Sequence, residues 1–442
     1  MAKKKKYNED HTAYSHKNNG LKTFLLSALC LVLGLLIGVF GNVFISLPDS
    51  YKIPSTRQSS SSSASADISS GEIDTNVITN SDVSIHFLEL GNKFTGDCIY
   101  IKIKRQGKDD DIDILVDGGS KSTSVPYITS YVDQYLTDNV LDFVIITHAH
   151  EDHYAGYAVR TTEDANTDES IFDHYRLNGK SIANVITFVK SNKDNASSTS
   201  IHGKYLKELG EVMASGANYY NALECYNNDN NTLNEVYDTS STANHDARRF
   251  YNFGQDSNGD DIKIQFLYTN FYKDSSKTEN NYSVCFQLIQ GEKRYLFTGD
   301  LEKDGEESLV NWSENGLSHV ELYKAGHHGS KTSSSETLMS AVTPSVVVVC
   351  CCAGSSEYTT KNENQFPTQE FVNNVSIYTS KIYVTSLCID YDANEFQSFN
   401  GTVVVCATGS GAVQVQCSNN STVLKDTEWF KNNRTLPTGA KN

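Results

Sequence analysis

The sequence lacks the patterns of several common classes of protein. Its ten cysteines include no Cys-x-x-Cys pair, and no segment repeats at a fixed period. Basic residues are in the minority, with 37 lysines and arginines against 54 aspartates and glutamates. The formal net charge of -17 disfavours broad adhesion to nucleic acid or to an anionic membrane surface. A compact phosphate substrate is still compatible with this charge, because bound cations can dominate the local potential.

Charged side chains are also absent from Phe24–Leu47, a run that follows the four lysines at positions 3–6. An apolar run of this length can cross a bilayer as a helix, and the positive-inside rule places the lysines in the cytoplasm. We therefore predict a basic cytoplasmic N-terminus over residues 1–20 and a transmembrane anchor over 21–47. The rest of the chain would then lie outside the cell. A cleaved signal peptide is the alternative, but the run exceeds the usual ~7–15-residue apolar core and no clean cleavage site follows it.

The remaining chain divides by composition. Residues 48–82 are rich in serine and poor in apolar residues, which predicts a flexible linker. Residues 83–425 have a globular composition and suit one large α/β domain, and residues 426–442 form a C-terminal tail. Residues 157–261 look like an insertion, which we expect to be helical or irregular and to carry substrate-specific features.

Short apolar, β-branched runs alternate with candidate helices over the globular part. The helix candidates cover residues 124–138, 202–217 and 304–315. Residues 202–217 place Tyr205, Leu206, Leu209 and Met213 on one face. Two groups of strands with interspersed helices predict two packed sheets covered by helices, a four-layer α/β sandwich.

The cysteine-rich stretch "VVVVCCCAG", residues 346–354, has two readings. Free cysteine behaves as a small apolar side chain, so the stretch is typical of a buried strand; a thiolate metal site is the alternative. Nine cysteines follow the apolar run, and an odd number cannot all pair within one chain.

The stretch "THAHEDHYAG", Thr147–Gly156, packs titratable groups directly behind the apolar run "LDFVII". Alternation along an extended strand end puts His148 and His150 on one side, and a following turn can present Asp152 and His153 to a second position nearby. Imidazole and carboxylate ligands are typical of Zn²⁺ with an open water position, with Mn²⁺ or Fe²⁺ as alternatives. The pattern predicts two adjacent metal sites; a polar loop with hydrogen-bonded histidines is the alternative.

Two later stretches place further ligand types at strand ends. "YLFTGDLE" ends an apolar run with Asp300, a carboxylate that could bridge two cations. "ELYKAGHHGSKTSSS" ends another with His327 and His328, followed by hydroxyl-rich residues 330–335.

Together with "LVDGGS", residues 115–120, these stretches resemble the metallo-β-lactamase fold, and specifically the extracellular hydrolase domain of ComEC-type competence proteins and related surface phosphodiesterases. The resemblance runs in order from about residue 83 to 416. It implies an αββα sandwich with a two-metal site at the sheet edges. By matching positions, the first metal would be held by His148 and His150, the second by Asp152, His153 and either His327 or His328, and Asp300 would bridge. Asp117 would orient a ligand from behind; a turn-forming aspartate before two glycines is the equal alternative.

The chain departs from the family in several places. Many members supply a third histidine to the first metal; His174, His202 and His245 are the candidates, and none stands in a recognisable motif. One span replaces the many spans of a complete DNA importer, so the importer role does not transfer. The chain also lacks a C-terminal aromatic repeat array, with Trp312 and Trp429 as its only tryptophans.

The predicted function is metal-dependent hydrolysis of a phosphodiester, in nucleic acid or in a phosphate-linked surface group, by a hydroxide held between two cations. Asp152 and Asp300 would be catalytic, and Ser330, Lys331 and Thr332 would grip phosphate oxygens. A cage of Tyr219, Tyr220, Tyr226 and Tyr251 would favour a quaternary ammonium group. We expect a phosphate-containing substrate and no stable nucleic-acid partner, while the oligomeric state is not readable from the sequence. The alternatives are a non-catalytic surface binding module and a lactam or thioester hydrolase.

Overall fold

The structure of the chain is a computed structural model. It describes residues 73–441, except 159–168, 194–195, 229–234 and 240–245. The chain divides into two units, residues 1–66 and 67–442. The first unit lies outside the described residues, as do the predicted anchor and most of the predicted linker. Within the described part, no helix combines the length and the hydrophobicity needed to cross a bilayer.

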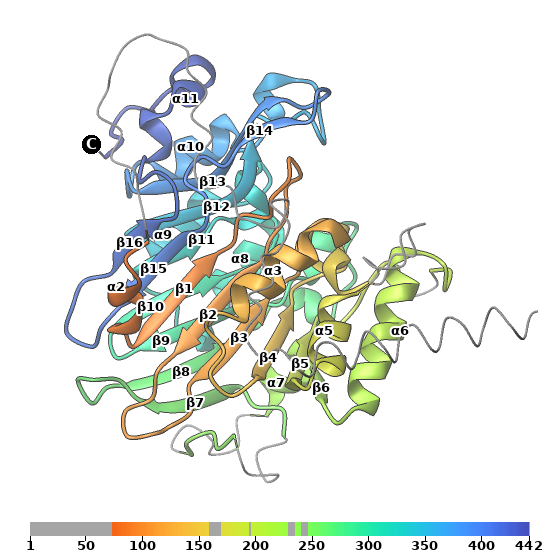
Figure 1. Ribbon diagram of the computed structural model, residues 1–442. Helices are drawn as coiled ribbons and strands as arrows, with labels where there is room; N and C mark the ends of the chain where they lie inside the picture. The colour runs from red at the N-terminus through yellow and green to blue at the C-terminus, as the bar shows by residue number, and fades with distance from the viewer. Residues whose placement is uncertain (1–72, 159–168, 194–195, 229–234, 240–245, 442) are drawn as a thin grey trace, which may run out of the picture. The chain divides into compact units, whose positions relative to one another are not determined.

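Two eight-stranded sheets form the centre of the described part (Figure 1). The first sheet has the strand order β16-β15-β1-β2-β3-β4-β5-β6. Its strands are β1 Val83–Phe87, β2 Ile99–Ile103, β3 Ile112–Val116, β4 Val140–Ile146, β5 Ser181–Thr187, β6 Asn218–Asn221, β15 Val403–Ala407 and β16 Gln414–Cys417.

The second sheet has the strand order β14-β13-β12-β11-β10-β9-β8-β7. Its strands are β7 Phe250–Gln255, β8 Asp261–Phe266, β9 Phe286–Gln290, β10 Lys293–Phe297, β11 Leu322–Lys324, β12 Val346–Ala353, β13 Ile382–Asp390 and β14 Glu395–Gln397.

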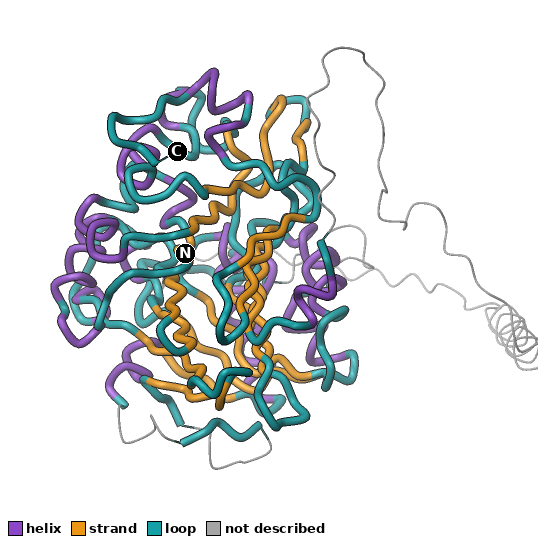
Figure 2. The backbone as a smooth tube through the Cα atoms, turned by 90° about the vertical axis from the view of Figure 1, so that its left-hand side faces the viewer, coloured by secondary structure: helices purple, strands orange, loops and turns teal. Residues whose placement is uncertain are grey.

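Helices flank the strands on both sides (Figure 2). The helices are α2 Thr75–Thr79, α3 Val125–Val132, α4 Glu151–Tyr154, α5 Ile171–Leu177, α6 Ile201–Ala214, α7 Ala222–Asn227, α8 Lys303–Asn311, α9 Glu336–Val342, α10 Gln369–Val375 and α11 Glu428–Asn433. Apolar residues of α3, α5 and α6 share one buried cluster with β3, β4 and β5. Those of α8, α9 and α10 share another with β10, β12 and β13.

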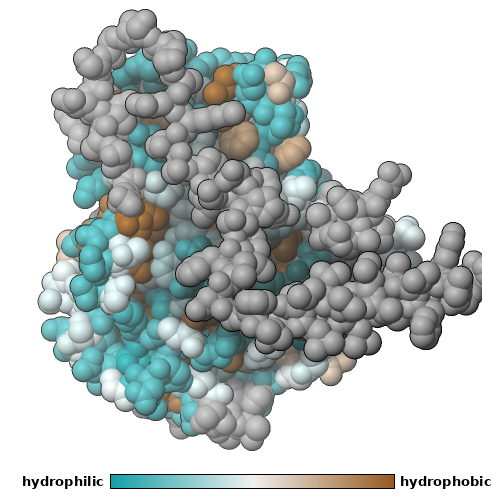
Figure 3. All heavy atoms as spheres, in the orientation of Figure 1, coloured by the Kyte–Doolittle hydropathy of each residue, from teal (hydrophilic) through white to brown (hydrophobic). Residues whose placement is uncertain are grey.

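A third apolar cluster joins the two sheets and forms the central core. Alternate residues of β1, β2 and β3 contribute to it, and so do alternate residues of β8, β9 and β12. Because side chains alternate along a strand, the residues between them face the helices on the outer side. The prediction of an α/β sandwich is therefore confirmed. On the face shown in Figure 3, the described residues are mostly hydrophilic, with hydrophobic side chains in separate small groups.

The region 157–261 is not only helical or irregular, as we expected. It contributes β5 and β6 to the first sheet and β7 to the second. In β5, "SIANVIT", the last four residues are fully buried because both faces of the strand are covered: Val185 packs in the cluster with the helices and Ile186 in the core between the sheets. The strand lacks a simple alternation of polar and apolar residues, as is usual for parallel strands covered on both faces.

Three helices were predicted at the correct places, but their details differ. The helix expected over 202–217 is α6, which buries Tyr205 and Leu209 as predicted. Leu206 and Met213, however, are 46% and 42% exposed, and Val212 takes the third buried position. Residues 205, 209 and 212 follow the i, i+4, i+7 spacing of one helix face, whereas residues 206 and 213 belong to the neighbouring stripe.

Ordered elements also lie in the segments predicted as linker and tail. Helix α2, in the predicted linker, buries Ile78 against Val404 and Cys406 of β15. Helix α11, in the predicted tail, buries Phe430 in the apolar cluster of the second sheet.

The cysteine-rich stretch forms β12, whose eight residues are all buried, as predicted. The nine cysteines in the part of the chain that the structure describes are all free thiols.

Candidate metal centre

The predicted ligands gather where parallel strands of both sheets end. In the first sheet, β3 and β4 are parallel neighbours, so the residues that follow them meet at one edge. In the second sheet, β10, β11 and β12 are parallel in the same way. The polar residues of the "VDGG", "THAHEDH", "TGD" and "GHHGS" stretches all follow these strand ends.

Gly299 allows the two edges to approach each other. Its φ of 53° is left-handed, and a Cβ atom at this position would lie 2.8 Å from the Oγ of Ser283 and 3.0 Å from the Cβ of Thr147. Any larger residue would therefore clash with the residue that follows β4. The glycine brings its neighbour Asp300 beside the histidines of the first sheet.

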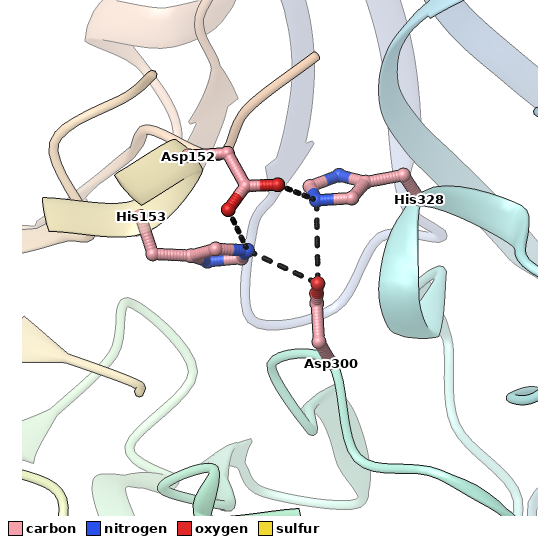
Figure 4. A group of neighbouring side chains, drawn as sticks. All are labelled: Asp152, His153, Asp300 and His328. Atoms are coloured by element: carbon pink, nitrogen blue, oxygen red, sulfur yellow. Dashed lines mark hydrogen bonds and ion pairs between the residues drawn. The ribbon is translucent and has the colours of Figure 1, made fainter. Parts of the chain in front are cut away.

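Four predicted ligands form one compact group (Figure 4): Asp152, His153, Asp300 and His328, with one ligand atom of each within 4.8 Å of the others. The Nε2 of His153 lies 3.1 Å from the Oδ2 of Asp300. The Nε2 of His328 lies 3.3 Å from the same oxygen and 3.4 Å from the Oδ2 of Asp152. Asp300 and both histidines are almost fully buried, whereas the side chain of Asp152 is 14% exposed.

His148 and His150 form an adjacent pair, as their spacing predicted. The Nε2 of His148 lies 3.1 Å from the Nδ1 of His150 and 3.9 Å from the Oδ2 of Asp300. His150 caps the N-terminus of α4, and the first turn of this helix carries Asp152 and His153. The end of β4 thus presents His148 and His150 to one position, and the short helix α4 presents Asp152 and His153 to the next. Asp300 Oδ2 lies between the two positions.

Contacts behind the histidines determine which ring nitrogen faces the centre. The Nδ1 of His328 donates to the carbonyl of Cys350, 2.9 Å away, and the Nδ1 of His153 donates to Asp117 Oδ2, 2.7 Å away. Asp117 also accepts from the backbone N–H and the hydroxyl of Thr147, both at 2.8 Å. With a proton on Nδ1 engaged behind the ring, each imidazole points its Nε2 at the centre.

Two residues that sequence reasoning missed stand behind this group. Lys324, the last residue of β11, forms a buried ion pair with Asp97 and lies 3.3 Å from the Oδ1 of Asp300. The carboxylate of Asp97 in turn lies 3.3 Å from the Nδ1 of His328 and 3.6 Å from that of His153. The feature of the sequence that could have identified Lys324 is its charge at the end of the strand-forming stretch "ELYK". Asp97 stands in a separate Thr-Gly-Asp stretch, residues 95–97, shortly before β2.

The charges of the group do not balance without a cation. The described residues of the group include one ammonium, that of Lys324, and four carboxylates, those of Asp97, Asp117, Asp152 and Asp300. Buried charges are unfavourable unless they are paired. This excess of negative charge favours a site for divalent cations.

The pKa shifts reflect the same imbalance. Burial acts to lower the pKa of His153, but Asp300, Asp117 and Asp97 outweigh it and raise that pKa well above its ordinary value. The pKa of His328 is also raised well above its ordinary value, because Asp300 and Asp97 outweigh the effect of burial. In contrast, burial and the charge of His153 hold the pKa of His148 well below its ordinary value. Protons on two imidazoles thus occupy the role that cations would take.

His328, and not His327, joins the group. Both residues have left-handed backbone angles, with φ of 46° and 53°, so the chain turns sharply and the two rings point to different partners. The Nδ1 of His327 lies 3.0 Å from the hydroxyl of Thr332 and 3.4 Å from the side-chain nitrogen of Asn280. Left-handed angles are uncommon outside glycine and asparagine and indicate a constrained site.

The predicted phosphate-binding residues do not all lie in the same place. The hydroxyls of Ser330 and Thr332 lie 3.1 Å apart beside His327, whereas Lys331 is exposed and donates to Asn364, 2.8 Å away. A residue that the sequence did not single out, Tyr358, donates its hydroxyl to Asp152 Oδ2 at 2.8 Å.

The two described candidates for a third ligand of the first metal, His174 and His202, do not join the group. His174, in α5, pairs with Asp133 at 2.9 Å. The ring of His202, in α6, packs against those of Tyr154 and Tyr205. His245 lies outside the described residues.

The predicted tyrosine cage is not formed. Tyr251 is buried in the core between the sheets. The ring of Tyr226 is covered by the guanidinium of Arg249, 4.4 Å from the ring centroid, and its hydroxyl donates to Glu314. Tyr219 accepts a hydrogen bond from Thr187 instead. The rings of Tyr226 and Tyr251 therefore serve packing, whereas Tyr219 is 37% exposed.

The spacing of the ligand atoms fits bound metal. Two ligand atoms on one tetrahedral Zn²⁺, each at about 2.0–2.1 Å, lie about 3.3 Å apart. The corresponding distances are 3.1 Å for His148 and His150, 3.1 Å for His153 and Asp300, and 3.3 Å for His328 and Asp300. The Nε2 of His328 is buried and has no hydrogen-bond partner among the described residues.

Comparisons with known proteins give short or weak similarities. No protein-family model matches the chain. A segment of 59 residues is 39% identical to ComE operon protein 3 of Bacillus subtilis (strain 168), and it covers 13% of this chain and 7% of that protein.

Three solved structures align with TM-scores too low to support an inference. CmlA, a diiron β-hydroxylase from Streptomyces venezuelae, is 13% identical with a TM-score of 0.30, over 62% of this chain and 45% of that one. A metal-dependent hydrolase from Parabacteroides distasonis is 11% identical with a TM-score of 0.22, over 59% and 87%. Yeast PDE1 is 12% identical with a TM-score of 0.27, over 69% and 87%.

Proposed function

We propose that the chain is a two-metal hydrolase of the metallo-β-lactamase type that cleaves a phosphodiester. The observation that carries this proposal is the convergence of six side chains from three strand ends, with neighbouring ligand atoms 3.1–3.4 Å apart. His148 and His150 would hold one cation, Asp152, His153 and His328 the other, and Asp300 would contact both. Zn²⁺ suits this nitrogen and oxygen donor set, and Mn²⁺ and Fe²⁺ are the alternatives that metal analysis distinguishes.

The two positions are not equally complete. The second position has four side-chain ligands in one compact group, whereas the first has two imidazoles and a more distant Asp300 Oδ2, 3.9 Å from His148. Neither described candidate for a third histidine joins it. We infer that the first position binds its cation more weakly and leaves more room for water and substrate.

A pair of divalent cations supplies Lewis acidity, which lowers the pKa of water and neutralises charge on substrate oxygens. The residues of this chain prepare the site for that chemistry. Asp117 and the carbonyl of Cys350 orient the imidazoles of His153 and His328. Tyr358 supports Asp152 from the solvent side.

A compact phosphodiester suits the surroundings of the site. The net charge of -17 opposes tracking along a long polyanion, so a short strand end or a phosphate-linked surface group is the favoured substrate. The hydroxyls of Ser330 and Thr332 beside His327 are donors within the same turn that could hold phosphate oxygens.

The test is hydrolysis of bis-(p-nitrophenyl) phosphate, single-stranded DNA, RNA and p-nitrophenyl phosphorylcholine, with and without a chelator. We expect the wild type to cleave at least the first compound. Chelation, or Asp300→Asn, should lower the rate by about a hundredfold or more, because each removes the stabilisation of charge in the transition state. The matched control is Asp304→Asn, an exposed aspartate four residues later, which should leave the rate unchanged.

The alternatives predict different results from the same protein. Cleavage of a chromogenic cephalosporin without cleavage of any phosphodiester would replace the proposal by carbon-centred hydrolysis. Tight binding of two cations without hydrolysis of any compound would indicate a binding module. A folded chain that binds no divalent cation would remove the basis of the proposal.

We also propose that residues 21–47 anchor the chain in the membrane and that the sandwich lies outside the cell. The support is the uncharged run after a lysine cluster. Protease treatment of intact cells should remove the folded part while leaving cytoplasmic proteins intact. Recovery of the full-length chain from the soluble fraction would contradict the anchor.

A further inference from the structure

Lys324 is buried at the centre of the acidic group, and each N–H donor of its ammonium has an acceptor. Its side chain is 1% exposed. The ammonium pairs with Asp97, lies 3.3 Å from Asp300 Oδ1, and donates to the carbonyl of Gly299 at 3.1 Å. A lysine has three N–H donors, and three acceptors surround this one. The ammonium is therefore held in one place by groups on two different strand ends.

The two oxygens of Asp300 have different surroundings. Oδ1 faces Lys324, whereas Oδ2 faces the Nε2 atoms of His153 at 3.1 Å, His328 at 3.3 Å and His148 at 3.9 Å. A free carboxylate can rotate and offer both oxygens to one cation, but this one is held by its outer oxygen.

We propose that Lys324 is a positioning residue that occupies Oδ1 of Asp300, so that Asp300 meets both cations through Oδ2 alone. This inference rests on the proposed function, since it assigns a role relative to the two cations. Because both cations would share this one oxygen, the two positions are adjacent. The affinity of each position for its cation then depends on the ammonium of Lys324, which holds Asp300 from behind.

A simpler role for Lys324 is to neutralise Asp97. Asp97 lies behind both His153 and His328, so an ion pair here could act only on those histidines. The two roles differ in the carboxylate through which the lysine acts, and a double-mutant cycle with Asp97 separates them.

The experiment compares the wild type, Lys324→Met, Asp97→Asn and the double variant. For each we would measure divalent-cation affinity and stoichiometry by titration of the metal-free chain with Zn²⁺ and with Mn²⁺, together with the thermal midpoint of the metal-free chain and kcat and KM. Methionine keeps the length of the side chain without the charge. The matched control is Lys102→Met, which removes another buried lysine. Lys102 lies on β2 of the first sheet and pairs with Asp113 on β3 at 3.2 Å.

We expect Lys324→Met to weaken cation binding by about ten- to a hundredfold, as is typical when a residue behind a ligand is removed. The same factor should appear in the Asp97→Asn background, and kcat should fall more than KM rises. Lys102→Met should lower the thermal midpoint and leave cation binding unchanged. The double variant also keeps the test decisive if Lys324→Met alone fails to fold, because it contains one unpaired buried carboxylate fewer.

Two results would overturn the inference while leaving the proposed function intact: unchanged cation affinity in Lys324→Met, or an effect that disappears in the Asp97→Asn background. In the second case the lysine acts through Asp97. A wild-type chain that binds neither Zn²⁺ nor Mn²⁺ would overturn the proposed function and this inference together.

Discussion

At the scale of single residues, Tyr358 is the exposed partner of Asp152, a carboxylate of the proposed metal centre. Its side chain is 55% exposed, and its hydroxyl donates to Asp152 Oδ2 at 2.8 Å. A hydrogen bond to a charged group contributes about 1.5–3 kcal/mol. We therefore expect Tyr358→Phe to lower kcat/KM for a phosphodiester by about ten- to a hundredfold, as measured by initial rates.

The control for this variant is Tyr226→Phe, which removes a tyrosine hydroxyl bound to Glu314 at 2.9 Å, elsewhere in the structure. It should leave the rate unchanged. Equal rates for wild type and Tyr358→Phe would mean that the hydroxyl does not support Asp152 during the reaction.

His86 makes the stability of the fold depend on pH. It is fully buried on β1 and contacts the hydroxyls of Tyr131 and Ser84, both at 2.8 Å. Burial, with a smaller effect of Lys102, lowers the pKa of His86 to about 3. The unfolded chain binds this proton near pH 6.5 and the folded chain does not, so the stability from His86 is present above pH 6.5 and is lost as the pH falls towards 3.

We expect His86 to lower the free energy of unfolding by about 1.4 kcal/mol per pH unit below pH 6.5. Urea denaturation of the wild type and His86→Gln at several pH values measures this contribution. The variant should be less stable at pH 7.5, and its stability should fall less steeply between pH 6 and pH 4. Parallel pH profiles of the two proteins would contradict the assignment.

At the scale of secondary-structure elements, Glu306 connects α8 to the loop before α9. It is fully buried and accepts hydrogen bonds from the backbone N–H groups of Ser334, at 2.6 Å, and Ser335, at 2.8 Å. This loop continues from the histidine turn, so Glu306 holds the segment that carries Ser330 and Thr332. Ser334 also has a left-handed φ of 52°, which the two hydrogen bonds help to maintain.

Glu306→Ala would leave two buried N–H groups without partners, each costing about 1–3 kcal/mol. We expect a loss of about 2–5 kcal/mol in the free energy of unfolding, as measured by urea denaturation of the metal-free chain. Glu307→Ala, at the neighbouring exposed position of the same helix, should change it by less than about 0.5 kcal/mol. Similar losses in both variants would show that helix propensity and not the loop contact is responsible.

At the scale of the whole molecule, the proposed function implies that cation binding is coupled to folding, because the folded chain buries an excess of carboxylates. A ligand at a hundred times its Kd stabilises the folded state by about 2.7 kcal/mol. We therefore expect the thermal midpoint to rise when Zn²⁺ or Mn²⁺ is added and to fall with a chelator. The Asp300→Asn variant should show a smaller rise than the Asp304→Asn control.

Because the two positions differ in completeness, the cations should leave one at a time. Titration with a chelator should remove the cation at His148 and His150 first, and a second, tighter step should follow. His150→Ala should abolish the weaker step and keep the tighter one. A single step with two equivalent cations would contradict the difference between the positions.

Several parts of the site and fold were predictable from sequence because they are local. His148, His150, Asp152 and His153 stand within six residues behind one buried strand, and short-range geometry keeps them together. The strand ends before Asp300 and before the histidine turn were recognisable by the same pattern of apolar residues followed by glycine and polar groups. Strand β5 was missed because a parallel strand covered on both faces lacks a clear alternation. Strands β6 and β7 were missed at the edges of the two sheets, where β6 has only four residues and none of them is fully buried.

By itself, the sequence determined the residue types of the candidate site, the strand ends that carry them and the sandwich that these strands build. Only the tertiary structure decided that His328 faces the centre while His327 turns away, and that Asp97, Lys324 and Tyr358 surround the same carboxylates. The physical reason is that ligand type and strand periodicity are local properties of the chain. The direction of a side chain in a left-handed turn, and the neighbours of a buried charge, depend on how the edges of the two sheets meet.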